Sequence, residues 1–349
     1  MRFSLFVHME RWDDAVPHQE SWEDLTELVL AAEAGGFDKV WIGEHHAMEY
    51  TVSPNPMLQL AYLAARTERI RLGAGTIIAP FWNPIRAAGE AALLDVISGG
   101  RTEIGLARGA YQFEFDRLVP GLAATDGGAH LREIVPAIRK LWAGDYAHDG
   151  EIWQFPTSTS VPKPVQADHP PMWIAARDPS SHDFAVANGC NVMVTPLAKG
   201  DEEVENLVDK FETAIAAHPE IERRPEIMVL RHTHVHAESD PEGWRAPAEA
   251  INRYYRTFDA VFGNKVPAVN GFIEPSPESK FAERPEFSPE SLHRTAMIGT
   301  PAEVIERLRH YEALGVDEYS FWIDNSMSHD EKAASLKLFI EEVVPAFSA

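Results

Sequence analysis

The chain has 349 residues, of which 45% are apolar and 24% charged, so it can bury a large core and does not have the composition of a disordered segment. Its net charge of −23 argues against binding to nucleic acid or to an anionic membrane surface. The single cysteine, Cys190, excludes an intramolecular disulfide and a cysteine-rich metal site. No segment reaches the roughly 20 apolar residues of a membrane span, and the N-terminal segment does not have a signal-peptide pattern, so we expect a cytoplasmic protein.

Strand-like and helix-like segments alternate along the chain. We expect strands where short apolar runs follow a helix stop, and helices where apolar residues recur every three or four positions after a cap. The expected strands are residues 2–7, 38–42, 70–78, 101–107, 172–176, 191–195, 226–235 and 317–323. The expected helices are residues 21–33, 55–66, 84–98, 130–143, 202–216 and 301–314, with another that begins at Asp178-Pro179.

Eight strand–helix units in one chain of this length predict an α/β fold, a closed (β/α)8 TIM barrel. A doubly wound sheet is the competing architecture, but it rarely needs so many parallel strands. We expect one domain over residues 1–349, with an insertion at 144–171. Residues 263–294 are rich in proline and show little periodicity, which predicts a long mobile loop, a lid, before the last barrel helix.

Active sites of such barrels lie where strands end, and four strand ends carry suitable residues. His45, in the segment 43–46, has an imidazole that acts as a general base near neutral pH. Arg108 stands beside a glycine and suits an anion, and the helix start at 177–181 offers N–H groups and hydroxyls to a phosphate. Small residues at 72–76 leave room for a flat ring. Each feature also has an ordinary structural explanation: a hydrogen-bonding loop, a surface salt bridge, a helix cap or a packed barrel layer.

Paired histidines also raise the question of a metal. His232, His234 and His236 share one face of a strand, because alternate residues of a strand point the same way. Along a strand, however, they spread over ~13 Å, which is too far for one ion. We therefore expect no metal site.

Taken together, these features resemble the bacterial luciferase-like family of flavin-dependent monooxygenases, and most of all its alkanal monooxygenase, or luciferase α-subunit, type. The resemblance rests on GFDKVWIGEHH, on LGAGTIIAPFWNPIRAAGEAALLDVISGGRTEIGLARGAYQFEF and on IGTPAEVIERLRHYEALGVDEY, in this order. It extends over nearly the whole chain. No single stretch would be specific enough, but their order and content are.

The resemblance implies roles for individual residues. His45 matches the catalytic histidine of the family, and Glu44 matches the acid placed under the flavin ring. Gly75 and Thr76 match the peptide, often cis, that supports the ring. The residues that match phosphate contacts are Arg108, Arg177, Asp178 through its N–H, and Ser181, with His130 or Arg132 in place of a second arginine. Asp178 departs from the pattern, because its carboxylate repels a phosphate. Lys265 and Lys280 belong to the lid.

The resemblance also implies an activity. Because no G-x-G-x-x-G nicotinamide motif occurs here, we expect a separate flavin reductase to supply reduced FMN. Reduced FMN then reacts with O2, and the resulting flavin hydroperoxide oxidises an apolar carbonyl compound such as an aldehyde. Aromatic residues near strand ends are candidates for the substrate pocket: Phe81, Trp82, Tyr111, Phe113 and Phe115. Each is equally explained as a core or interface residue.

Two other functions remain open at this point. One is a deazaflavin-dependent oxidoreductase that transfers hydride without O2 chemistry. The other is a non-catalytic flavin-binding protein or partner subunit, against which the presence of His45 argues. Because the family dimerises through its second and third helices, here residues 55–66 and 84–98, we expect a dimer, a homodimer in the simplest case.

Overall fold

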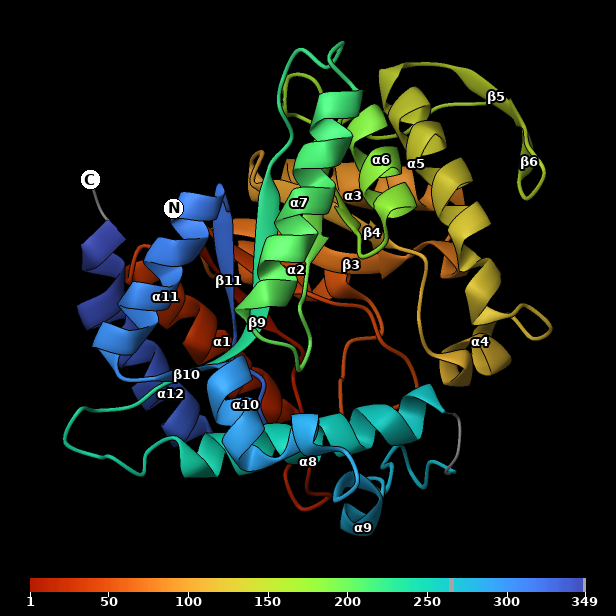
Figure 1. Ribbon diagram of the computed structural model, residues 1–349. Coiled ribbons are helices and arrows are strands. Elements are labelled where there is room, and N and C mark those ends of the chain that lie inside the picture. The colour runs from red at the N-terminus through yellow and green to blue at the C-terminus, as the bar shows by residue number, and fades with distance from the viewer. Residues whose placement is uncertain (264–266, 348–349) are drawn as a thin grey trace.

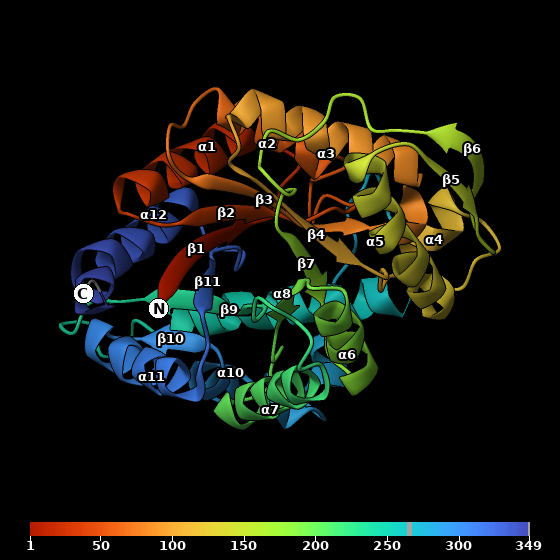
Figure 2. The same ribbon diagram turned by 90° about the horizontal axis from the view of Figure 1, so that it is seen from above.

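Eight parallel strands close into a barrel, as the sequence predicts (Figures 1 and 2). The computed structural model describes residues 1–263 and 267–347. In barrel order the strands are β1 (Arg2–Val7), β2 (Lys39–Ile42), β3 (Arg71–Ile78), β4 (Thr102–Ala107), β7 (Met172–Ala175), β8 (Asn191–Val194), β9 (Ile227–Val235) and β11 (Glu318–Trp322). Pairing of β11 with β1 and of β8 with β9 closes the ring, and short β10 (Met297–Gly299) adds to the end of β9.

Helices surround the barrel, each placed by the connection that follows a strand. They are α1 (His18–Ala34), α2 (Pro56–Ala64), α3 (Pro84–Ser98), α5 (Gly127–Ala143), α6 (Pro179–Ala187), α7 (Asp201–Ala217), α11 (Pro301–Leu314) and α12 (His329–Leu338). Local sequence sets several of their starts. Asn55, Asn83, Asp178 and Thr300 each accept a hydrogen bond from the first turn, and each precedes a proline at the first helical position. Among the described residues, no helix is long and apolar enough to cross a membrane.

The connection after β9 differs most from the expectation. It holds a long helix, α8 (Arg245–Phe262), which runs across the carboxyl-terminal end of the barrel (Figures 1 and 2). The segment expected to be an irregular lid contains α9 (Glu278–Phe281) and α10 (Pro289–Thr295), and α10 packs on α8 through buried Leu292. Lys280 pairs with Asp259 of α8, and Lys265 lies outside the described residues. The chain continues past the eighth strand, β11, into α12. The segment 263–294 therefore precedes α11 and not, as expected, the last barrel helix.

Residues 144–171 form a projection beside α5. Its two strands, β5 (Tyr146–Asp149) and β6 (Gln154–Ser158), pair as an antiparallel hairpin. Figure 2 shows this hairpin at the edge of the molecule, beside α5 and α4 (Gln112–Leu118). It lies away from the strand ends considered below.

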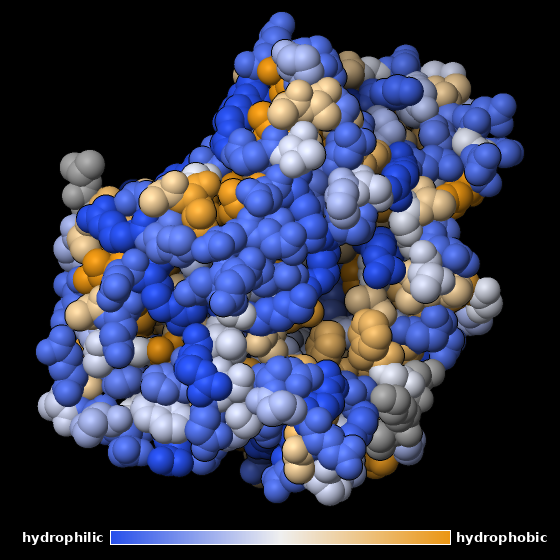
Figure 3. All heavy atoms as spheres, in the orientation of Figure 1, coloured by the Kyte–Doolittle hydropathy of each residue, from blue (hydrophilic) through white to orange (hydrophobic). Residues whose placement is uncertain are grey.

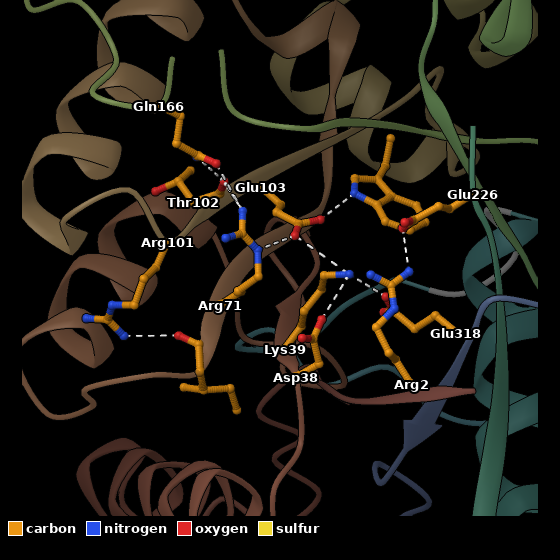
Figure 4. A network of polar contacts seen from close by, with 12 residues as sticks. Arg2, Asp38, Lys39, Arg71, Arg101, Thr102, Glu103, Gln166, Glu226 and Glu318 are labelled. Carbon is orange, nitrogen blue, oxygen red and sulfur yellow. Dashed lines mark hydrogen bonds and ion pairs between the residues drawn. The ribbon is translucent and has the colours of Figure 1, made fainter. Parts of the chain in front are cut away.

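A buried ionic network fills the amino-terminal end of the barrel (Figure 4). Lys39 Nζ lies 2.5 Å from Glu318 and 3.6 Å from Glu103, and Arg71 bonds Glu103 at 2.5 Å. The indole of Trp41 donates to Glu318 at 2.9 Å. Burial alone would lower the pKa of Lys39, but its carboxylate partners raise it, so the lysine stays charged. Because these side chains occupy this end, a ligand is left with the opposite end of the barrel.

Candidate active site

The four strand ends singled out from the sequence meet at the carboxyl-terminal mouth of the barrel. They belong to β2, β3, β4 and β7, which are consecutive neighbours in the sheet. His45, Thr76, Arg108 and Arg177 follow or end these strands and therefore border one opening. In TIM barrels this is the end that carries the chemistry.

A cavity of about 490 Å³ gathers most of the residues expected to bind phosphate. Five cationic side chains and two carboxylates line it, so it is net positive in a chain whose net charge is −23. The cations are Arg108, Arg132, Arg177, Lys199 and Lys210, and the carboxylates are Asp178 and Glu203. Ser181 and the first turn of α6 also border it, which adds N–H groups at a helix N-terminus.

Asp178 organises the start of α6. Its carboxylate accepts hydrogen bonds from the hydroxyls of Ser180 at 2.8 Å and Ser181 at 2.6 Å, and from the N–H of Ser181 at 3.1 Å. Burial would raise the pKa of Asp178, but these hydrogen bonds outweigh it and lower the pKa to about 2. The Ser181 hydroxyl, expected on the phosphate, therefore donates to an ionised carboxylate here.

The arginines of the cavity differ in how firmly they are held. Arg177 donates to Glu203 at 2.7 Å and to the carbonyl of Thr195, and Arg132 donates to Ser180 at 3.1 Å. Arg132 thus stands where a second phosphate-binding arginine was expected. His130, the other candidate, does not line the cavity; its ring meets Trp153 edge-on at 5.4 Å.

Small residues lie toward the end of β3, at the same mouth of the barrel. The Gly75–Thr76 peptide bond is cis, as the resemblance leads us to expect. A Cβ on Gly75 would lie 3.1 Å from Trp41 and 3.3 Å from Met193, so a side chain there would be tight. Gly75 and Thr76 are partly exposed and Ala175, at the end of β7, is exposed, although all three lie on barrel strands. This surface suits a flat ring.

A buried carboxylate that the sequence analysis missed holds His45. Glu114 of α4 is 1% exposed, and its Oε1 accepts hydrogen bonds from Nδ1 of His45 at 3.2 Å and from the N–H of His46 at 2.8 Å. The imidazole of His45 also stacks on Tyr111 at 5.1 Å between ring centroids. An acid between two buried aromatics, Phe113 and Phe115, was the available signal.

Glu44 connects the loops on either side of the mouth. Its Oε2 accepts from the N–H of Ile78 at 2.6 Å and from the indole of Trp82 at 2.8 Å, and its Oε1 bonds His46 at 2.6 Å. The carboxylate therefore ties the end of β2, which carries His45, to the end of β3.

Aromatic side chains form the opposite side of the mouth. Trp322, at the end of β11, stacks on His232 of β9 at 3.9 Å, and Tyr254 of α8 meets Trp322 at 5.3 Å. The ring centroid of His8, which follows β1, lies 5.3 Å from that of His45 and 5.6 Å from that of Trp322. Burial lowers the pKa of His8 well below its usual range and that of His232 to about 3, so both rings are neutral.

The aromatic residues expected from the sequence are distributed differently. Tyr111 contacts His45, whereas Phe113 and Phe115 are buried and Phe81 packs against His46 and Phe115. Within residues 1–263 and 267–347, no group of three histidine, cysteine, aspartate or glutamate side chains is placed to hold a metal ion.

Comparison with known proteins agrees with this geometry. The sequence profile of the luciferase-like monooxygenase family matches residues 1–318. The oxygenase component of a flavin-dependent trigonelline monooxygenase from Acinetobacter baylyi is 53% identical over 348 residues, which cover 100% of this chain and 96% of that protein. An alkanal monooxygenase alpha chain from Photorhabdus laumondii is 36% identical over 190 residues, 54% of this chain and 52% of that one.

A solved structure supports the fold independently. A monooxygenase from Streptomyces bottropensis superposes with a TM-score of 0.83 and 24% identity, covering 100% of both chains. The chain belongs to the luciferase-like monooxygenase family and is a flavin-dependent monooxygenase.

Proposed function

We propose that this protein is the oxygenase component of a two-component system that uses reduced FMN and O2 to oxidise a small aromatic cation of the trigonelline class. The observation that carries the proposal is the net-positive cavity, which gathers the expected phosphate residues at the ends of β4 and β7. The partly exposed Gly75 and Thr76 lie on β3, the neighbouring strand of the same sheet, and His45 follows β2. The sequence has no G-x-G-x-x-G nicotinamide motif, and the 53% identical relative is an oxygenase component, which supports a separate flavin reductase as the source of the reduced cofactor.

FMN fits the residues of the mouth. Arg108, Arg132 and Arg177, with the N–H groups at the start of α6, would hold its phosphate. The small residues at the end of β3 would lie against its ring. Bound reduced flavin supplies the electrons that activate O2. The flavin hydroperoxide expected from the resemblance stays a prediction, and a deazaflavin in the same place stays the alternative.

His45 would move the proton. With Nδ1–H donated to Glu114, the imidazole keeps one tautomer and presents Nε2 as acceptor to the mouth. Tyr111 limits rotation of the ring by stacking on it. Tyr254 and Trp322 exclude water from the far side of the site.

Two substrate classes are open to such a site. The relative that is 53% identical over almost its whole length is a trigonelline monooxygenase component. Trigonelline is an N-methylpyridinium carboxylate. The aldehyde expected from the sequence remains the second candidate, because 36% identity to an alkanal monooxygenase alpha chain covers half of this chain. We place the pyridinium compound first because the likeness is higher and covers the entire chain.

A homodimer is the assembly we propose. Exposed apolar side chains gather on two neighbouring helices: Leu58 and Tyr62 on α2, and Leu93, Val96 and Ile97 on α3. Leu58 is 71% exposed, and burying such a face against a second copy is favourable. Light scattering should give twice the mass of a 38.9 kDa chain, and L93R should shift it to the monomer. A wild-type monomer would refute the proposal.

The activity is tested with the purified protein and photoreduced FMN. Trigonelline or a long-chain aldehyde is added under argon, 18O2 is admitted, and products are analysed by mass spectrometry. We expect the wild type to form a product of trigonelline that contains one 18O atom. The H45A variant should not form this product. Reoxidation to free FMN without product from either compound would overturn the proposal, and tight deazaflavin binding would then favour hydride transfer.

A further inference from the structure

The side of the mouth opposite the expected flavin surface is an aromatic wall, which we define as Tyr50, Tyr111, Tyr254 and Trp322. Tyr254 lies at its centre, 5.0 Å from Tyr50 and 5.3 Å from Trp322 between ring centroids. Three of these residues come from different connections of the barrel and Trp322 ends β11, and all four are buried, at 2 to 6% exposure. Figure 3 shows a hollow above α8 with apolar groups gathered around it.

Polar atoms beside this wall have no partner. In the part of the chain that the structure describes, His8 Nδ1, Trp322 Nε1 and Glu114 Oε2 are buried without a hydrogen bond. Buried polar groups in native proteins are nearly always satisfied, so such a cluster around His45 indicates a polar ligand. A pocket made for an alkyl chain does not need these atoms.

Carboxyl groups outnumber cationic groups behind the wall. Glu114 stands next to His45, and Asp324 accepts the N–H of His8 at 2.5 Å. Lys332, the nearby ammonium group, lies 3.4 Å from Glu10 and 3.5 Å from Asp324, so two carboxylates face one cation. Because His8 and His232 are held neutral by burial, they add no positive charge.

We infer that the aromatic wall recognises the substrate and selects a flat organic cation, an N-alkylated pyridinium, over a ring of the same shape without the positive charge. The negative faces of tyrosine and tryptophan rings attract such a cation, and the carboxylates behind them add to the attraction. The inference rests on the proposed function, which takes this mouth as the substrate site and a pyridinium compound as the substrate, and it adds the residues that recognise the ring charge.

The test compares two ligands that differ in one atom. Trigonelline carries a positive ring nitrogen, and 3-methylbenzoate has carbon in its place. Their dissociation constants are measured by calorimetry, with and without oxidised FMN. We expect the wild type to bind trigonelline about tenfold more tightly. Y254L and W322L should reduce this preference to about threefold or less, while Y254F, which keeps the ring, should retain it.

Controls separate recognition from folding and from catalysis. Y146L, in the hairpin of β5, removes a tyrosine far from the mouth and should leave the preference unchanged, and circular dichroism melts confirm that each variant is folded. Equal binding of the two ligands, no binding of trigonelline, or an unchanged preference in folded Y254L and W322L would overturn the inference. Selective binding without oxygenation would retain it and overturn the proposed function instead.

Discussion

Replacing Glu114 with alanine should disable His45 without touching the flavin surface. The carboxylate accepts two hydrogen bonds, from Nδ1 of His45 at 3.2 Å and from the N–H of His46 at 2.8 Å, and it is buried. A hydrogen bond to a charged group contributes about 1.5–3 kcal/mol, which corresponds to about a 10- to 160-fold loss of turnover when the imidazole is no longer oriented. General base catalysis contributes about 10²–10⁴-fold, so the loss in H45A is the upper limit.

Single-turnover product formation with prebound reduced FMN measures this loss, and flavin affinity is titrated separately. E114Q keeps an acceptor oxygen for Nδ1 of His45 and should lose less than E114A. In the H45A background, E114A should cost nothing more, since it acts through His45. Wild-type turnover in a folded E114A variant, or an equal further loss in H45A, would refute the reasoning.

Three further predictions concern charge. D178N keeps the helix cap but removes a carboxylate that its pKa of about 2 keeps ionised. Without this negative charge, FMN should bind about threefold more tightly in a fluorescence titration, and weaker binding would contradict this. K39M leaves Glu318 and Glu103 buried without their ammonium partner, so the free energy of unfolding in urea should fall by about 3–5 kcal/mol. Flavin affinity should stay unchanged, because it depends on the other end of the barrel. Burial raises the pKa of Asp324 to about 7, above its value of about 3.9 in the unfolded chain. The folded state therefore binds the extra proton between these values, so the contribution of Asp324 to stability falls as pH rises from about 4 to about 7. The free energy of unfolding of the wild type, measured relative to D324N, should decrease over this range, and a constant difference would contradict the reasoning.

The sequence by itself determined the barrel and the strand ends. Short apolar runs, asparagine and threonine caps before proline, and glycine stops are local signals, because a helix or strand is set by residues a few positions apart. They placed His45, Gly75 and Arg108 at the same end of the sheet. The helix α8 was missed although Ala248, Ile251 and Tyr255 follow helical spacing, because no element was assigned between the strand expected at 226–235 and the proline-rich segment 263–294.

Only the tertiary structure decided what surrounds these residues. Glu114 and His45 are 69 positions apart, and their contact depends on how α4 returns over the end of β2. The phosphate cavity gains Lys199 and Lys210 from the connection after β8, and the aromatic wall combines Tyr254 of α8 with Trp322 of β11. Such contacts follow from barrel closure and strand register, which bring distant segments together and leave no periodic trace in the local sequence.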